Sequence, residues 1–192
     1  MNAALRKKLI VAFVAAGLSA PAAFVGLDIT LPAEGLVLSP YPDPVGLTTY
    51  CVGHLATKKD VVKDKYTEEE CMTIFAQDYK KHRAELDSVV KVSFSSEWQR
   101  EALTDFTFNN GIGNLKSSTL LSLVNQGKHK EACQQLVRWV YAKGKKLKGL
   151  VTRRDNTMPY CLGELSYDKQ KDYEQFLKEW DLEVKNQKAN SN

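Results

Sequence analysis

One stretch near the start of the chain restricts its fold most, because it needs shelter from water. Residues 9–27 are 19 residues without a charge, and they directly follow Arg6, Lys7 and Lys8. As a helix, this run would be about 28 Å long, close to a bilayer core of roughly 30 Å. Basic residues before such a run keep the N-terminus cytoplasmic, while the chain after it is exported. We therefore expect residues 1–27 to be a signal-anchor segment.

The same run is only weakly apolar. Nine of its residues are Leu, Ile, Val or Phe, and the other ten are Ala, Gly, Ser or Pro. Each of the former contributes only about −0.3 to −0.6 kcal/mol to membrane insertion. Three interpretations stay open: a signal peptide cleaved near Ala20-Pro21-Ala22, a permanent anchor, or an uncleaved anchor that later leaves the bilayer.

The overall charge of the chain does not suggest a genome-binding protein. The 192 residues are 43% hydrophobic and 26% charged, as in ordinary globular proteins, so disorder and collagen-like repeats are excluded. The net charge is +4, but residues 9–192 carry 24 basic and 23 acidic residues. Residues 128–154 hold nine basic residues and one acidic residue, which favours a solvated helical face or attraction to an anionic polymer. We expect no nucleic-acid partner.

The four cysteines agree with export. All of them follow the apolar run, and they show neither CxxC nor metal-ligand spacing: Cys51, Cys71, Cys133 and Cys161. Disulfides are typical of oxidising compartments, and three connectivities are open. Pairing of sequence neighbours would close loops of ordinary size and add about 3 kcal/mol for each bridge. We expect neither a metal nor another cofactor.

The rest of the chain predicts an α+β fold. Residues 35–55 combine Pro, Gly and short β-prone pieces, as in a small antiparallel sheet. Helices are predicted to start at Thr67, whose capping box ends at Glu70, at Ser95 or Ser96, and at Ser117 or Ser118, with others over 129–142 and 169–185. We expect a sheet lobe and a larger helical lobe within residues 28–165, a ligand cleft between them, and a charged helical extension over 166–192.

Three side chains suggest glycoside hydrolysis. Cleavage of a glycosidic bond needs one carboxyl group to protonate the leaving oxygen and an ionised one to activate water or attack the sugar. Glu34 lies at an expected helix end, Asp43 in a Pro-rich turn, and Thr49 on the following strand. A strand hydroxyl could orient the water. Spacing alone is weak support, because the chain has 23 acidic residues.

The residues around this trio carry a family resemblance. The pattern is Glu34-Gly35-Leu36-x-Leu38-x-x-Tyr41-x-Asp43-x-x-Gly46-x-x-Thr49-x-x-x-Gly53-His54-Leu55, joined later by Phe75-Ala76-Gln77-Asp78, Phe108-Asn109-Asn110-Gly111, Arg138-Trp139 and residues 149–154. It resembles the phage lysozyme (endolysin) family, typified by the T-even phage enzyme. Within that family the chain resembles in particular the signal-arrest-release endolysins of lambdoid phages. The resemblance covers residues 31–162.

The resemblance implies a lysozyme-like fold and hydrolysis of the β-1,4 bond between N-acetylmuramic acid and N-acetylglucosamine in peptidoglycan. It implies that Glu34 is the general acid, Asp43 the base or electrostatic partner, and Thr49 the water-orienting residue. It places Asn109, Asn110 and Gly111 at the substrate, pairs His54 with Asp78 as a structural contact, and makes the four cysteines disulfide-bonded.

The resemblance also implies how the enzyme is deployed. We expect a monomer that is exported, held inactive at the inner membrane by residues 9–27, and then released into the periplasm, with a holin as a functional partner. Two alternatives remain: a lytic transglycosylase, which needs no water-activating Asp43, and an inactive membrane-tethered wall-binding protein.

Overall fold

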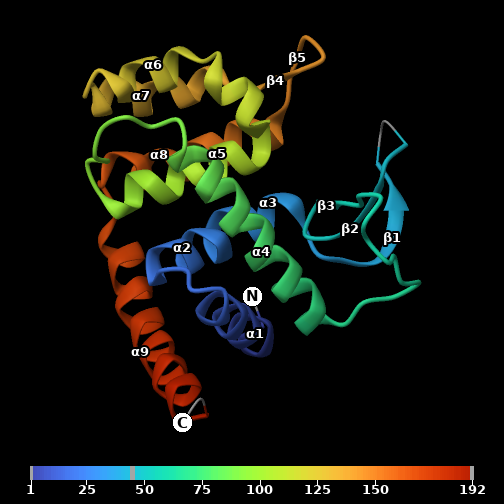
Figure 1. Ribbon diagram of the computed structural model, residues 1–192. Helices are drawn as coiled ribbons and strands as arrows, with labels where there is room; N and C mark the ends of the chain where they lie inside the picture. Colours follow the sequence, from blue (N-terminus) through green and yellow to red (C-terminus); the bar gives the residue numbers. More distant parts are fainter. Residues whose placement is uncertain (1, 44–45, 191–192) are drawn as a thin grey trace. The chain divides into compact units, whose positions relative to one another are not determined.

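The computed structural model describes residues 2–43 and 46–190. Figure 1 shows its elements in order: α1 (Ala3–Ala15), α2 (Ala20–Val25), a π-helix (Gly26–Thr30), α3 (Leu31–Glu34), β1 (Val37–Pro42), β2 (Thr48–Cys51), β3 (His54–Leu55), α4 (Glu68–Asp87), α5 (Glu97–Lys116), α6 (Thr119–Asn125), α7 (His129–Gln134), a 3-10 helix (Gln135–Arg138), β4 (Tyr141–Ala142), β5 (Lys145–Lys146), α8 (Lys148–Leu162) and α9 (Tyr167–Asn190). They form two compact units.

The first unit joins both ends of the chain, and the second is continuous in sequence. The first comprises Met1–Lys80 and Tyr173–Asn192, and the second Lys81–Asp172. The boundaries expected after residues 27 and 165 divide the chain by function, whereas the two units are defined by packing. These expected boundaries therefore stay a prediction.

The uncharged N-terminal run does not form one straight helix. Helix α1 ends at Ala15, and the chain bends at Gly17, whose φ is +71°. The hydroxyl of Ser19 then accepts a hydrogen bond from the amide of Ala22, which caps the start of α2. In the described ranges, 2–43 and 46–190, no helix combines the length and the apolar character that crossing a bilayer requires.

This run supplies much of the core of the first unit. Leu9, Phe13 and Val25 are completely buried. The ring of Phe13 lies 5.3 Å from that of Phe75 and 5.4 Å from that of Tyr79, both on α4. Most of the large apolar side chains that would face lipid in a membrane span therefore face protein in this fold, although Val11 is exposed.

A small sheet follows the N-terminal run. Its strand order is β1-β2-β3, and both pairings are antiparallel. Thr49 on β2 lies opposite Tyr41 on β1 and Leu55 on β3. A disulfide between Cys51 and Cys71 ties β2 to α4, and this is the pairing of sequence neighbours.

Helix α4 begins as the capping box predicts. The amide of Thr67 donates to Oε2 of Glu70 at 2.9 Å, and the amide of Glu70 donates to the Thr67 hydroxyl at 3.2 Å. Each side chain thus satisfies a backbone donor that the first helical turn leaves open. The predicted helix start at residue 67 is confirmed.

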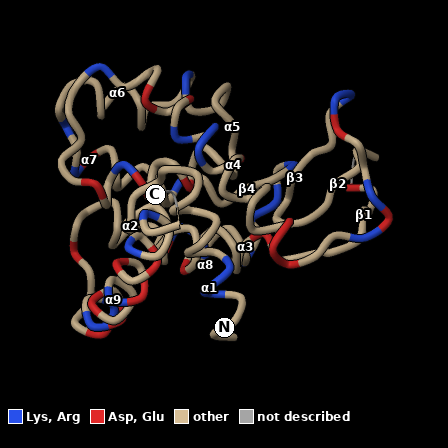
Figure 2. The backbone as a smooth tube through the Cα atoms, turned by 60° about the horizontal axis from the view of Figure 1, so that its bottom comes forward, with Lys and Arg blue, Asp and Glu red and all other residues tan. Residues whose placement is uncertain are grey.

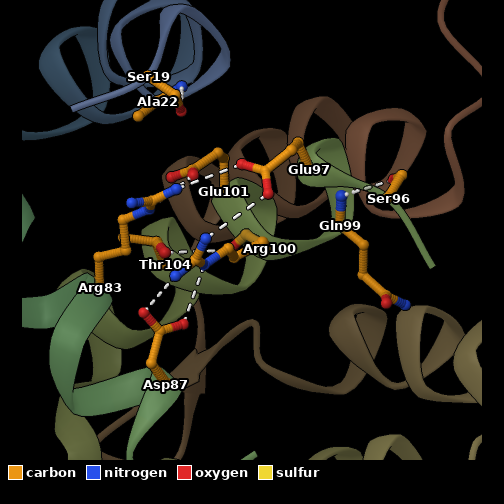
Figure 3. A network of polar contacts seen from close by, with 10 residues as sticks. All are labelled: Ser19, Ala22, Arg83, Asp87, Ser96, Glu97, Gln99, Arg100, Glu101 and Thr104. Carbon is orange, nitrogen blue, oxygen red and sulfur yellow. Dashed lines mark hydrogen bonds and ion pairs between the residues drawn. The ribbon is translucent and has the colours of Figure 1, made fainter. Parts of the chain in front are cut away.

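The second unit is helical, and its interior contains charge. Arg153 of α8 donates to both carboxylate oxygens of Asp105 on α5, at 2.7 and 3.2 Å, and both residues are buried. A disulfide joins Cys133 of α7 to Cys161 of α8. Figure 3 shows a second charged cluster in this unit, formed by Arg83, Asp87, Glu97, Arg100 and Glu101.

The predicted helix over 129–142 is wrong at its C-terminal end. Helix α7 stops at Gln134, a 3-10 turn follows to Arg138, and β4 and β5 then form a short hairpin. Lys143 and Gly144 make its two-residue turn, with positive φ at both positions as such hairpins require. The basic run is therefore partly an exposed hairpin rather than one helical face. The α+β fold with a small antiparallel sheet and a helical part is confirmed.

Candidate active site

Glu34 ends helix α3 and is half-buried. The next residue, Gly35, has a φ of +77° and turns the chain towards β1. A Cβ atom built on Gly53 would lie 3.2 Å from Oε2 of Glu34, so this carboxylate sits against the backbone of the turn between β2 and β3. A glycine at position 53 leaves room for it.

Asp43 lies in the connection between β1 and β2. Its amide donates to the carbonyl of Leu47 at 2.8 Å, and its Oδ1 accepts from the amide of Leu47 at 2.8 Å. These two bonds fix the direction of the carboxylate from within its own turn. Residue 44, the second of the prolines flanking Asp43 in the sequence, lies outside the described residues.

Thr49 is on β2 and is only 4% exposed. Its hydroxyl donates to the carbonyl of Leu47 at 3.3 Å, which is a long hydrogen bond. Asp43 follows Tyr41, the β1 partner of Thr49, by two residues in the chain. The three predicted catalytic residues therefore all belong to the first unit, within α3, β1, β2 and the turn that joins these strands.

His54 and Asp78 form a short contact between the sheet and α4. Nδ1 of His54 lies 2.7 Å from Oδ2 of Asp78, and Nε2 lies 3.7 Å from Oδ2 of Asp60. The hydrogen bond to Asp78 raises the pKa of His54, with burial acting in the opposite direction. The ring of Tyr50 packs 4.8 Å from the imidazole. This pair joins β3 to α4 next to the strand that carries Thr49.

The predicted substrate residues lie in the second unit, at a break in α5. Gly111 interrupts the helix with φ +76° and ψ +155°. The side-chain Nδ2 of Asn110 donates to the backbone carbonyl of Phe106 at 3.0 Å. Oδ1 of Asn109 accepts a hydrogen bond from the buried guanidinium of Arg154. The side chain of Asn109 thus has a structural partner on α8.

Sequence reasoning assigned no role to Gly53, Asp60 or Arg154. Gly53 could have been found, because a glycine directly before His54 in the quoted pattern indicates a tight backbone approach. The sequence does not indicate that Arg154 is buried, because arginine is rarely buried unless it is paired. Its partner Asn109 on α5 is distant in sequence, so the pairing cannot be read from neighbouring residues.

Comparison with known proteins decides the family. The sequence model described as phage lysozyme matches residues 32–157, about two thirds of the chain. The chain belongs to the phage lysozyme family. All the predicted catalytic residues, the His54–Asp78 pair and Asn109–Gly111 lie inside the matched region.

Relatives and solved structures agree with this family. The SAR-endolysin of Bacteriophage PS119 is 45% identical over 130 residues, covering 67% of this chain and 76% of the relative. The endolysin from Escherichia coli O157:H7 phage FAHEc1 superimposes with a TM-score of 0.63 at 29% identity, over 73% of this chain and 92% of that one. The active form of P1 phage endolysin Lyz gives a TM-score of 0.67 over 83% and 94%, and at 19% identity it supports the fold alone.

The family confirms the expected activity. This phage lysozyme is a muramidase that degrades peptidoglycan, the endolysin reaction that lyses the host. The first 31 and the last 35 residues lie outside the match of the family model.

Proposed function

We propose that this endolysin cleaves the β-1,4 bond after N-acetylmuramic acid with Glu34 as the general acid. The observation that carries this proposal is the position of the Glu34 carboxylate against Gly53, on the sheet that also bears Thr49 and leads into the Asp43 turn. A helix end and a backbone turn hold the acid from two sides. Such support fixes a reacting group, and a misplacement of 1 Å can lower a rate about a hundredfold.

In the proposed reaction, the Glu34 proton goes to the leaving glycosidic oxygen while positive charge develops at the sugar carbon. Asp43, ionised, stabilises that charge or takes a proton from the attacking water, and the Thr49 hydroxyl orients this water. If the anomeric carbon is inverted, the two carboxyl groups stand roughly 6.5–9.5 Å apart in the productive complex to leave room for water. The product then has a free reducing muramic end.

For substrate binding, we propose that the Asn109–Gly111 turn of the second unit contacts the glycan strand. A kink at Gly111 supports this role, because its non-helical φ and ψ break the regular course of α5 and set the Asn109–Gly111 turn apart from the helix around it.

Substitution of the three residues tests the catalytic assignment. We expect Glu34→Gln to abolish turbidity loss of purified peptidoglycan, and Asp43→Asn and Thr49→Val to lower it by at least tenfold. Asp64→Asn is the matched control, because Asp64 is an exposed carboxylate of the same unit. Circular dichroism and thermal unfolding would show that each variant remains folded.

Mass spectrometry of the released fragments separates the alternatives. A hydrolase leaves reducing muramic ends, whereas a lytic transglycosylase leaves 1,6-anhydro ends. Full activity of Asp43→Asn together with anhydro products would overturn the role of Asp43. An inactive wall-binding protein would pellet with peptidoglycan but cause no turbidity loss, even as the wild type.

We further propose that residues 9–27 tether the enzyme to the inner membrane after export and keep it inactive until release into the periplasm. Only six residues separate Leu27 from Glu34, so membrane insertion of the run would pull directly on α3. Loss of the membrane potential, for example through a holin, removes roughly 2.3 kcal/mol per charge per 100 mV. Ala15→Leu combined with Gly17→Leu should strengthen insertion and delay lysis, and unchanged timing would contradict the tether.

A further inference from the structure

Helix α9 lies wholly outside the region that matches the family, yet one of its faces is buried. Phe176 is completely buried and Trp180 is 8% exposed. The rest of the helix is rich in acidic and basic residues, which alternate in colour along the tube of α9 in Figure 2. A helix with one apolar face is stable in water only when that face has a partner.

The partner of this face is the N-terminal run. The ring of Phe24 on α2 lies 5.1 Å from that of Tyr173 and 5.2 Å from that of Phe176, in edge-to-face geometry. Farther along α9, Nε2 of Gln187 donates to the carbonyl of Val11 at 3.1 Å. The two ends of the chain, both outside the family match, therefore pack on each other.

Charges before the apolar run take part as well. Nε of Arg6 lies 2.8 Å from Oε2 of Glu179, and the Arg6 guanidinium lies 5.3 Å above the ring of Phe176. Lys8 forms ion pairs at 2.7 and 2.9 Å with Glu68 and Glu69, at the start of α4. In the tethered enzyme, these cations would lie on the cytoplasmic side, across the bilayer from their partners. These ion pairs can form only after the N-terminus has crossed.

We propose that the apolar face of α9, formed by Tyr173, Phe176 and Trp180 with Glu179 at its edge, is the docking surface that captures the released N-terminal run. The inference rests on the proposed tether. Docking to α9 competes with lipid for the same side chains, because Phe24 cannot contact both. Capture by α9 would therefore favour release, and it would hold α1 and α2 in the fold that leads into α3 and Glu34.

Limited proteolysis of the purified, soluble full-length chain tests this docking. Trypsin cleaves after Arg6, Lys7 and Lys8 only when the first turns of α1 are undocked. We expect the combined Phe176→Ala and Trp180→Ala variant to release the N-terminal peptide at least tenfold faster than the wild type, by mass spectrometry. The matched control combines Tyr167→Ala and Leu182→Ala, two apolar side chains of α9 that are 71% and 61% exposed. This control should digest like the wild type.

Cleavage in the exposed β4–β5 hairpin provides an internal reference, since its rate should not change. If the Phe176 and Trp180 variant no longer unfolds cooperatively, it is not properly folded, and Glu179→Arg then provides the test of docking. That substitution places a second cation beside Arg6, so the two repel each other while the apolar face stays unchanged. It should increase the rate of N-terminal cleavage about threefold. Asp181→Arg, with the same charge change at an exposed position of α9, is its control. Equal protection in all variants would overturn the proposal.

An experiment in cells tests the capture by α9 independently of the catalytic role of Glu34. In a Glu34→Gln background the cells should stay intact, so the distribution of the chain between membrane and soluble fractions can be compared after the membrane potential is collapsed. We expect at least threefold more of the Phe176 and Trp180 variant to remain in the membrane fraction than of its matched control. Neither readout requires peptidoglycan cleavage, so a failed catalytic assignment leaves this test valid. Equal fractions would overturn the capture role.

Discussion

The Glu34 carboxylate lies against the backbone of Gly53, and a Cβ atom at position 53 would stand 3.2 Å from Oε2 of Glu34. Gly53 also has a φ of +68°, a left-handed conformation that residues with a side chain adopt only at a cost. A glycine at this position thus serves both the turn between β2 and β3 and the placement of the proposed acid.

Gly53→Ala should impair catalysis more than stability. The left-handed backbone should cost about 1–2 kcal/mol, and the added methyl group should displace the carboxylate and lower activity at least tenfold. Gly144→Ala is the control, because φ is +75° there and the added Cβ meets nothing within 4 Å. It should lose similar stability in urea unfolding but keep its activity on peptidoglycan. Equal activities of the two variants would contradict the positioning role of Gly53.

The contribution of His54 to stability should depend on pH. The hydrogen bond to Asp78 raises the pKa of His54, so the folded state binds the proton more tightly than the unfolded state. This stabilisation is fully present below the unfolded pKa of about 6.5 and is lost as pH rises through the higher folded value. The difference in unfolding free energy between the wild type and His54→Gln should therefore shrink from pH 6 to pH 9, measured by urea unfolding. If this difference in unfolding free energy stays constant from pH 6 to pH 9, a charged His54–Asp78 pair is excluded.

Glu101 should produce a pH dependence in the second unit. Burial raises its pKa to about 7, although the Arg83 guanidinium, bonded at 2.8 Å, acts in the opposite direction (Figure 3). Because the unfolded carboxyl titrates near 4.5, the folded state binds more protons between pH 4.5 and 7. Stability should then fall as pH rises through this window, by a few kcal/mol at most. Glu101→Gln should remove this slope in unfolding experiments, and an unchanged slope would contradict the assignment.

Breaking the Asp105–Arg153 pair should be costly. Arg153 and Arg154 both face Asp105, and all three side chains are at most 4% exposed. Asp105→Ala would leave buried cations without their carboxylate, which typically costs about 3–5 kcal/mol. The exposed pair of Lys63 and Glu70 offers a contrast, because water screens it and Lys63→Gln should therefore cost much less stability. Thermal unfolding of both variants measures the difference, and a similar loss would contradict the buried-pair account.

Local signals in the sequence predicted much of the fold. The capping box at Thr67 and the serines at 96 and 118 start helices as expected, because each side chain satisfies a backbone donor of its own first turn. Glu34, Asp43 and Thr49 are predicted mainly from the resemblance of the residues around them to the phage lysozyme family, because their spacing alone is weak support. Their roles in catalysis remain predictions.

The predictions that fail do so for different physical reasons. Helix α8 was not predicted, since its inner face carries Arg153 and Arg154 where a periodic pattern would have apolar residues, and their partners lie on α5. The predicted helix over 129–142 is too long, because a run of basic residues is compatible with both an exposed helix and an exposed hairpin. The bend of the apolar run is not predicted either, although Gly17 with its positive φ and the capping Ser19 two residues later are local signals for it.

Each of the two disulfides closes within a single unit: Cys51–Cys71 in the first and Cys133–Cys161 in the second. Thiols stay reduced in the bacterial cytosol, so newly made chains there lack both covalent crosslinks. The strand that bears Thr49 gains its bond to α4 only in an oxidising environment. If the enzyme is exported as proposed, both crosslinks form only after it has reached the side of the membrane where the wall lies.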